Sequence, residues 1–243
     1  MSKPPLVLLH GVGLDHTVWE PLEAILADRF EVLAPDLPGH GAAPGVAEGV
    51  TLADLAREVA AVVPNRAHLI GFSLGALVAQ HLAIHRPELV ATLTSVSSVC
   101  RRTDVERAAV LDRLAVAERD LGASTSASID RWFAGTDVAP EWVERTRATL
   151  AANDQDSFLR CYRVFATGDA EVGPDLGRIS VPSLAITGQE DPGSTPEMTH
   201  RLAAAIPGCR AEVVPHTRHM LPLERPGALA AAITALIGDQ IHA

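Results

Sequence analysis

The sequence predicts an α/β fold in which helices cover both faces of a mostly parallel, twisted sheet. Short apolar runs alternate with amphipathic, helix-like stretches along most of the 243 residues, as expected for strand–helix–strand units. The runs are almost uninterrupted by polar residues, which is typical of strands covered on both faces. The alternation stops between about residues 101 and 178, where only helical patterns occur, and then resumes. We therefore expect a helical cap inserted after the fourth strand.

The strands expected before this interval are short apolar runs at residues 6–9, 31–34, 68–70 and 89–96. Apolar residues at helical spacing predict helices between them at residues 18–28, 51–63 and 74–85. Pro35 closes the second strand, and the third strand runs into Gly71. Thr51 is a suitable N-cap for the second helix, and Pro87 ends the third.

Within the interval, the clearest helical patterns cover residues 108–121 and 141–153. Strands are expected after it at residues 183–187 and 211–214, each followed by a helix, at residues 196–205 and 227–237. The chain therefore divides into an α/β core, residues 1–100 and 179–243, and a helical cap, residues 101–178.

Composition narrows the classes of function. The net charge of −10 disfavours nucleic acids and anionic membranes as partners. The start of the chain lacks the pattern of a signal peptide, and the longest weakly polar stretch, residues 228–238, is too short to cross a membrane. Three cysteines, an odd number at distant positions, indicate reduced thiols and a cytoplasmic protein. No cluster of His and Cys has the spacing of a metal site, and we expect no cofactor.

The strongest local motif is Gly71-Phe72-Ser73-Leu74-Gly75, which matches G-x-S-x-G. An apolar strand precedes it and a helical pattern follows it. A serine on such a sharp strand-to-helix turn is lifted above the sheet edge, and glycines two positions to either side let strand and helix pass closely. A chance glycine-serine turn is the alternative, and the flanking strand and helix disfavour it. Ser73 is the candidate nucleophile.

A serine hydroxyl needs an adjacent base, and the base needs a carboxylate that orients it. His219 follows the last strand, in a loop expected at the same sheet edge as Ser73, and His216 is its rival. Asp191 follows the strand at residues 183–187, and the adjacent Glu190 is the alternative carboxylate. We favour Ser73 as nucleophile, His219 as base and Asp191 as the orienting acid.

The developing oxyanion also needs donors. The backbone amides of Val12, in the loop after the first strand, and Leu74, at the start of a helix, are the candidates. In that first loop, His10 is interpreted as a loop-shaping residue. Two further residues near sheet-edge loops are interpreted as structural: His40, in the glycine-rich turn 36–41, which lacks a phosphate-binding pattern, and Cys100, as a buried thiol.

Together these segments resemble the α/β-hydrolase superfamily over nearly the whole chain. The resemblance implies an α/β-hydrolase fold, with nucleophile, acid and base at Ser73, Asp191 and His219 and oxyanion amides at Val12 and Leu74. The sequence departs from larger members because little chain precedes the first strand, so the usual leading hairpin is absent or trimmed. That departure concerns pairing at the sheet edge and leaves the site unaffected.

The cap is similar to that of 3-oxoadipate enol-lactonases and related carboxylesterases, on Ile129 to Phe133, Asn153-Asp154 and Phe158 to Tyr162. This resemblance implies that Arg131 and Trp132 contact a substrate carboxylate or ring. The alternative places Trp132 in the cap core and Arg131 in solvent. Arg101 and Arg102, at the start of the cap, are further cationic candidates, with a solvated hinge as the favoured interpretation.

The predicted function is a serine hydrolase that cleaves a small-molecule carboxylic ester or lactone through an acyl-enzyme on Ser73. The same three residues would also serve hydrolysis of a C–C bond in a vinylogous diketone, an amide or a thioester. A binding protein that kept the fold is disfavoured because all three residues and both oxyanion segments are present. The expected partner is a small-molecule substrate, and assembly as a homodimer is left open.

Overall fold

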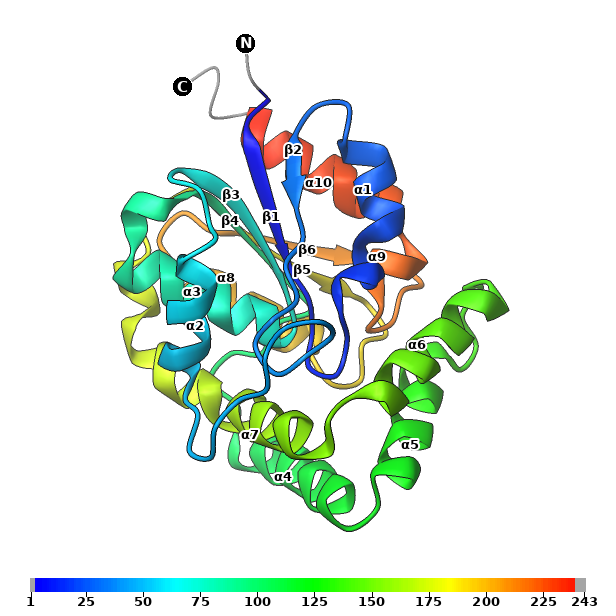
Figure 1. The fold of residues 1–243 in the computed structure, drawn as a ribbon. Coiled ribbons are helices and arrows are strands. Elements are labelled where there is room, and N and C mark those ends of the chain that lie inside the picture. The colour runs from blue at the N-terminus through cyan, green and yellow to red at the C-terminus, as the bar shows by residue number, and fades with distance from the viewer. Residues whose placement is uncertain (1–2, 239–243) are drawn as a thin grey trace.

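A computed structural model describes residues 3–238, and its centre is a six-stranded parallel sheet in the order β2-β1-β3-β4-β5-β6 (Figure 1). The strands are β1 (Pro5–Leu9), β2 (Glu31–Leu33), β3 (Ala67–Phe72), β4 (Val90–Val96), β5 (Ser183–Gly188) and β6 (Arg210–Val214). Each expected strand matches one of these within a few residues. Every neighbouring pair is parallel, and the predicted fold class is confirmed.

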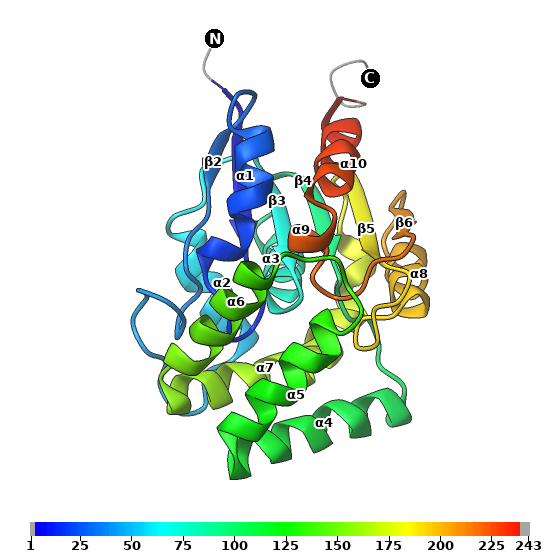
Figure 2. The same cartoon turned by 90° about the vertical axis from the view of Figure 1, so that its right-hand side faces the viewer.

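The alternation of side chains along β1 explains why both faces of the sheet are apolar. Leu6 and Leu8 belong to one buried cluster, while Val7 and Leu9 belong to the cluster on the opposite face, and all four are fully buried. The first cluster is covered by α1 (Glu20–Leu26), α9 (Leu221–Glu224) and α10 (Pro226–Gly238). The second is covered by α2 (Leu52–Ala60), α3 (Leu74–His85) and α8 (Pro196–Ala205), on the other side of the sheet (Figures 1 and 2).

Two helix expectations differ in detail from the structure. The helix expected over residues 18–28 is divided into a 3-10 turn, η1 (His16–Trp19), and α1, with Pro21 in the first turn of α1. Pro21 has no amide hydrogen, so that position is suited to a helix start. The helix expected over residues 51–63 begins after Thr51, which caps α2 as predicted, and ends at Ala60. A second 3-10 turn, η2 (Pro87–Leu89), precedes β4.

Four helices lie between β4 and β5: α4 (Asp104–Arg119), α5 (Leu121–Phe133), α6 (Pro140–Ala152) and α7 (Gln155–Val172), followed by the 3-10 turn η3 (Gly173–Arg178). They lie over the carboxyl ends of the strands, at the end of the molecule opposite the start of β1 (Figures 1 and 2). The expected helices at 108–121 and 141–153 correspond to α4 and α6. The division of the chain at residues 101 and 178 stays a prediction. Within residues 3–238, no helix is long and apolar enough to cross a membrane.

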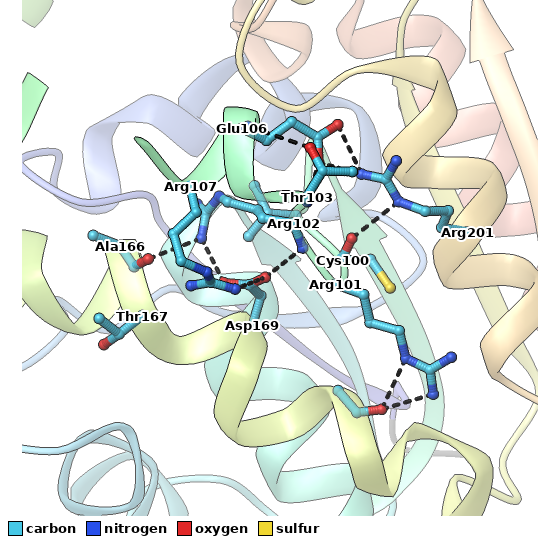
Figure 3. A network of polar contacts seen from close by, with 12 residues as sticks. Cys100, Arg101, Arg102, Thr103, Glu106, Arg107, Ala166, Thr167, Asp169 and Arg201 are labelled. Atoms are coloured by element: carbon cyan, nitrogen blue, oxygen red, sulfur yellow. Dashed lines mark hydrogen bonds and ion pairs between the residues drawn. The ribbon is translucent and has the colours of Figure 1, made fainter. Parts of the chain in front are cut away.

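A buried ion pair anchors the first residues of this helical segment (Figure 3). Asp169 on α7 accepts hydrogen bonds from the Arg102 guanidinium and from the Arg102 backbone amide, both at 2.7 Å. Arg107 adds a second ion pair to the same carboxylate at 3.2 Å. The side chains of Arg102 and Asp169 are 2 % and 0 % exposed. The favoured interpretation of Arg102 as part of a solvated hinge is therefore wrong, because its charge is compensated by an acid 67 residues away.

Figure 3 shows two further sets of contacts, one that attaches this segment to the core and one within the segment. Arg201 on α8 pairs with Glu106 on α4 at 2.7 Å and donates to the carbonyl of Cys100. Arg101 donates to the carbonyl of Gly173 through two guanidinium nitrogens. Arg101 and Arg102 are therefore engaged in structural contacts, and neither lines the cavity described below.

Candidate active site

Ser73 lies on the turn between β3 and α3, with the strained backbone that a nucleophile turn requires. Its φ of 54° and ψ of −110° are outside the regions that L-residues ordinarily adopt. A Cβ atom on Gly71 would lie 2.3 Å from the carbonyl oxygen of Gly75, and one on Gly75 would lie 2.1 Å from that of Leu9. Only glycine fits at both positions, because backbone atoms cannot move aside. Strand and helix therefore pass as closely as the sequence motif predicts.

Asp191 and His219 form a buried pair at the carboxyl ends of β5 and β6. The Nδ1 of His219 lies 2.7 Å from Oδ2 of Asp191, and the two residues are 6 % and 3 % exposed. The other carboxylate oxygen, Oδ1, accepts hydrogen bonds from the amides of Gly193 and Ser194, both at 2.9 Å. Oδ1 is thus occupied by donors, and Oδ2 is left to accept the Nδ1 hydrogen of the imidazole. This geometry favours the tautomer whose Nε2 is free to accept a proton.

The loop that carries His219 is fixed from two sides. The Ser97 hydroxyl, at the end of β4, donates to the His219 carbonyl at 3.2 Å. Glu224 accepts a hydrogen bond from the Arg218 amide at 2.9 Å, and its burial raises the pKa of its carboxyl group. At the neighbouring strand end, a Cβ on Gly188 would lie 2.2 Å from the Thr217 carbonyl oxygen. Close packing of these two loops brings the acid and the base together.

The loop after β1 is held by the helical segment above it. Gly13 has a φ of 77°, and its carbonyl accepts a hydrogen bond of 2.8 Å from the Asn153 side chain at the end of α6. The adjacent Val12 lines the same cavity as Ser73.

The second expected oxyanion donor is at the start of a helix. Leu74 is the first residue of α3, where helix geometry leaves the amide without an intrahelical acceptor. Its side chain is buried in the core beneath the site. Both segments expected to supply oxyanion donors therefore adjoin Ser73.

One cavity brings the predicted residues together. Ser73, Asp191, His219 and Val12 line it, and so do both cap candidates, Arg131 and Trp132. Apolar and aromatic side chains and a few polar groups line it together, which is typical of a small-molecule site. Within residues 3–238 there is no group of three or more His, Cys, Asp or Glu side chains that could hold a metal ion.

Trp132 lies against the candidate base. Its ring stacks on that of His219, with centroids 5.6 Å apart and planes inclined by 26°. On another side of the imidazole, the Phe72 ring lies 5.1 Å away. Two aromatic rings thus restrict the orientation of the imidazole and exclude water from its faces. Trp132 packs partly in the apolar core and also borders the cavity, and its contact with a substrate stays a prediction.

The rival residues lie elsewhere. His216 and Glu190, the alternative base and acid, are exposed, 3.8 Å apart, and line a separate surface groove.

The two residues interpreted as structural are buried. Cys100 is 1 % exposed, burial raises the pKa of its thiol to about 11, and it does not line the cavity. His40 is also buried, and its Nδ1 donates to the carbonyl of Pro38 at 3.1 Å.

His10 joins the loops that follow β1 and β2. Its Nε2 accepts the amide hydrogen of Leu37 at 2.8 Å, while its Nδ1 donates to the carbonyl of Gly11 at 2.8 Å. This pattern requires a neutral imidazole, because a protonated Nε2 could not accept. Burial, assisted by the nearby His40, lowers the pKa of His10 to about 3. His10 therefore shapes the loop, as its interpretation from the sequence states.

Arg113 is the charged cavity residue that sequence reasoning missed. It lies on α4, three residues after Val110 and one before Leu114, both of which are buried. A charged residue flanking the buried stripe of a helix is the signal that could have found it. The aromatic face of α7 was only partly anticipated: Phe158 and Tyr162 were named from the sequence, and both line the cavity.

Chemically, the arrangement offers a hydroxyl on a strained turn, an imidazole oriented by a carboxylate, and backbone amides at a helix N-terminus, all at one rim of a parallel sheet. These are the parts that acyl transfer through a covalent intermediate requires. The carboxyl ends of parallel strands are also where α/β folds place their ligands.

Comparison with known proteins agrees with this description. Residues 6–232 match the alpha/beta hydrolase family. The chain is 30 % identical over 236 residues to (E)-2-((N-methylformamido)methylene)succinate hydrolase of Acinetobacter baylyi, covering 95 % of this chain and 89 % of that protein. It is 30 % identical over 243 residues to pimeloyl-[acyl-carrier protein] methyl ester esterase of Aeromonas hydrophila, covering 97 % and 96 %.

Among solved structures, the enol-lactonase from Burkholderia xenovorans LB400 superimposes with a TM-score of 0.77 at 25 % identity, covering 98 % of this chain and 92 % of that one. The resemblance to enol-lactonases and esterases, drawn from the sequence, is confirmed.

Proposed function

We propose that this chain, which belongs to the alpha/beta hydrolase family and is a hydrolase, cleaves a small-molecule carboxylic ester or lactone through an acyl-enzyme on Ser73. The observation that carries the proposal is the cavity in which the strained Ser73 turn meets the buried His219–Asp191 pair. Relatives that act on a methyl ester and on an enol-lactone support the bond type.

In the acylation step, the Ser73 hydroxyl oxygen attacks the substrate carbonyl carbon while its proton passes to Nε2 of His219. Asp191 stabilises the resulting imidazolium through the hydrogen bond from Nδ1. The negative charge that develops on the carbonyl oxygen is met by the amides of Val12 and Leu74. The intermediate then expels the alkoxide oxygen, which takes the proton from Nε2, and the acyl group stays on Ser73. For a lactone, the expelled oxygen remains attached to the acyl chain.

In the deacylation step, a water molecule attacks the acyl carbon and gives one proton to Nε2 of His219. The C–O bond to Ser73 breaks, the serine oxygen recovers that proton, and the carboxylic acid leaves. No step draws on a cofactor. Trp132 and Phe72, which pack on the imidazole, keep its ring aligned for both proton transfers.

The direct test combines labelling and turnover. A fluorophosphonate probe should modify the folded protein, and Ser73→Ala should abolish the labelling and reduce kcat on a 4-nitrophenyl ester by several orders of magnitude. Undiminished turnover in that variant would refute the assignment of Ser73. A panel of nitrophenyl esters, enol-lactones and dienoic diketones separates ester and lactone cleavage from C–C hydrolysis, and nitroanilides and thioesters extend it to the other acyl bonds.

We also place the protein in the cytoplasm. Cys100, Cys161 and Cys209 are all free thiols, which fits a reducing compartment. Fractionation of cells that express the tagged protein tests this location.

A further inference from the structure

Three charged side chains line the cavity: Asp191, Arg113 and Arg131. The charge of Asp191 is engaged by His219 and by two backbone amides. The remaining charges are two guanidiniums, from α4 and α5. In a chain with 30 acidic and 20 basic side chains, the surroundings of Ser73 are thus locally cationic.

Neither guanidinium is neutralised by the protein. Arg131 donates within its own helix, to the Ser128 hydroxyl at 2.9 Å and to the Ala127 carbonyl at 3.4 Å. Arg113 makes no hydrogen bond or ion pair with the residues in the range 3–238. An arginine carries five N–H donors, so most of the donors of this pair are free for a ligand.

Other arginines of the same helical segment are paired with acids. Arg102 bonds Asp169 at 2.7 Å, and Arg145 bonds Glu20 at 2.6 Å. Arg101 and Arg119 also lack an acidic partner in the described part of the chain, but they lie outside the cavity, whereas the unpaired guanidiniums of Arg113 and Arg131 line it.

Holding these two charges together is unfavourable in the empty protein. Partial burial lowers the pKa of the Arg131 guanidinium, and the positive charge of Arg113 lowers it further. Like charges that share a partly desolvated site repel one another, and a bound anion would compensate both. A single guanidinium can bind a planar carboxylate through two parallel hydrogen bonds.

We propose that Arg113 and Arg131 form a carboxylate-binding subsite, so that the substrate is an ester or lactone bearing a second, ionised carboxylate away from the bond that is cleaved. This inference rests on the proposed function. It assigns to Arg113 a role that neither the sequence motifs nor the family match supplies.

The position of the subsite relative to the reacting groups fits a short acyl chain. The Arg131 guanidinium lies 5.9 Å from the Trp132 ring, and that ring stacks on His219. A carboxylate held by Arg131 therefore lies one tryptophan ring away from the base. Leu150 and Phe158 provide an apolar wall for the methylene groups between the two ends of the substrate.

The kinetic test compares two esters that differ only in charge: mono-4-nitrophenyl adipate and its neutral methyl ester, with release of nitrophenolate as the readout. The wild type should prefer the anionic ester in kcat/KM by more than about tenfold, since hydrogen bonds to charged groups contribute roughly 1.5–3 kcal/mol each. Arg113→Gln and Arg131→Gln should each reduce this preference about tenfold, mainly through KM, and should leave the neutral ester within about twofold. Arg131→Lys should retain part of the preference.

Arg119→Gln is the matched control. It makes the same change of charge on α4, at an exposed position outside the cavity, and should leave the preference unchanged. Equal turnover of both esters by the wild type, or equal losses on both esters in the Arg113 and Arg131 variants, would overturn the subsite.

A binding measurement separates failure of the subsite from failure of the proposed function. Calorimetry with the Ser73→Ala variant should detect monomethyl adipate and give at least tenfold weaker binding of dimethyl adipate. That difference should disappear when Arg113→Gln and Arg131→Gln are added. Charge-dependent binding without ester turnover in the wild type would leave the subsite standing and reject the ester or lactone chemistry. Turnover of neutral esters without charge-dependent binding would reject the subsite and leave the ester or lactone chemistry standing.

Discussion

Replacing Asp191 by asparagine tests the orientation of the proposed base. The Oδ1 atom accepts two amide hydrogens, from Gly193 and Ser194, each at 2.9 Å. An asparagine must keep its carbonyl oxygen there, because turning the amide round would point its NH2 group at these two donors and lose two hydrogen bonds, about 2 kcal/mol at least. Its NH2 group then faces Nδ1 of His219, 2.7 Å away in the wild type. The imidazole has to accept at Nδ1 and carry its hydrogen on Nε2, the wrong tautomer for a base.

The expected loss in kcat is about 10⁴-fold, or about 5.5 kcal/mol of activation free energy. The assay is initial-rate hydrolysis of a 4-nitrophenyl ester, together with ¹⁵N NMR of the histidine ring to identify the tautomer. Glu190→Gln is the matched control, since it makes the same chemical change at the neighbouring, exposed carboxylate and should stay within about twofold. A kcat for Asp191→Asn within tenfold of wild type, or a His219 that keeps its hydrogen on Nδ1, would refute the reasoning.

Three predictions concern stability. Asp169→Ala leaves the buried Arg102 charge unpaired and should destabilise by about 3–5 kcal/mol, whereas Arg102→Met combined with Asp169→Leu should lower Tm less than Asp169→Ala does. A Tm for Asp169→Ala within about 2 °C of wild type contradicts this. Gly75→Ala drives a Cβ into the backbone of β1 and should abolish soluble expression or lower Tm by at least about 5 °C, while Gly227→Ala, whose Cβ meets nothing within 4 Å, should be neutral or stabilising. Because His10 has a pKa of about 3 when folded and about 6.5 when unfolded, the unfolded chain binds the extra proton between these values. Stability should therefore fall as pH drops below about 6.5, by up to about 1.4 kcal/mol per pH unit, and His10→Gln should reduce the difference in Tm between pH 7 and pH 5. An unchanged difference would show that His10 is not the group responsible.

The core could be predicted from the sequence because its signals are local. Each strand is a short apolar run, and two of them carry a residue with a steric role near their end: Pro35 just after β2 and Gly71 near the end of β3. The parallel topology then places all loops that follow the strands at one edge. Ser73, Asp191 and His219 line one cavity there although they are far apart in sequence, so knowledge of the strand ends was sufficient to bring their loops together. His216 and Glu190 lie in the same loops, and the sequence favoured His219 by its place in the loop and the motif that follows it, with Glu190 left as the alternative to Asp191.

The cap could be predicted only as helical, because its contacts depend on tertiary packing. Arg102 follows another arginine in a loop, and nothing near it in sequence indicates Asp169 as its partner. Arg113 was missed for a similar reason: whether a residue beside a buried stripe faces solvent or a cavity depends on which helix lies opposite. For Arg131, the sequence left solvent and the substrate site as alternatives, and the packing of α5 over the strand ends places it on the cavity.

Cap and core are not independent in this molecule, because cap residues contact the groups assigned to the chemistry. Asn153 bonds the carbonyl of Gly13, next to an expected oxyanion donor, and Trp132 stacks on His219. Substitutions at these two positions disturb transition-state stabilisation and should lower kcat. Arg113 and Arg131 contact neither Ser73 nor His219 by hydrogen bonds, so their substitution should act on substrate affinity and mainly raise KM. The cap therefore has two groups of residues with separate effects. Substitutions at Arg113 and Arg131 should change which substrate binds, while Asn153 and Trp132 continue to hold the oxyanion loop and the imidazole in place.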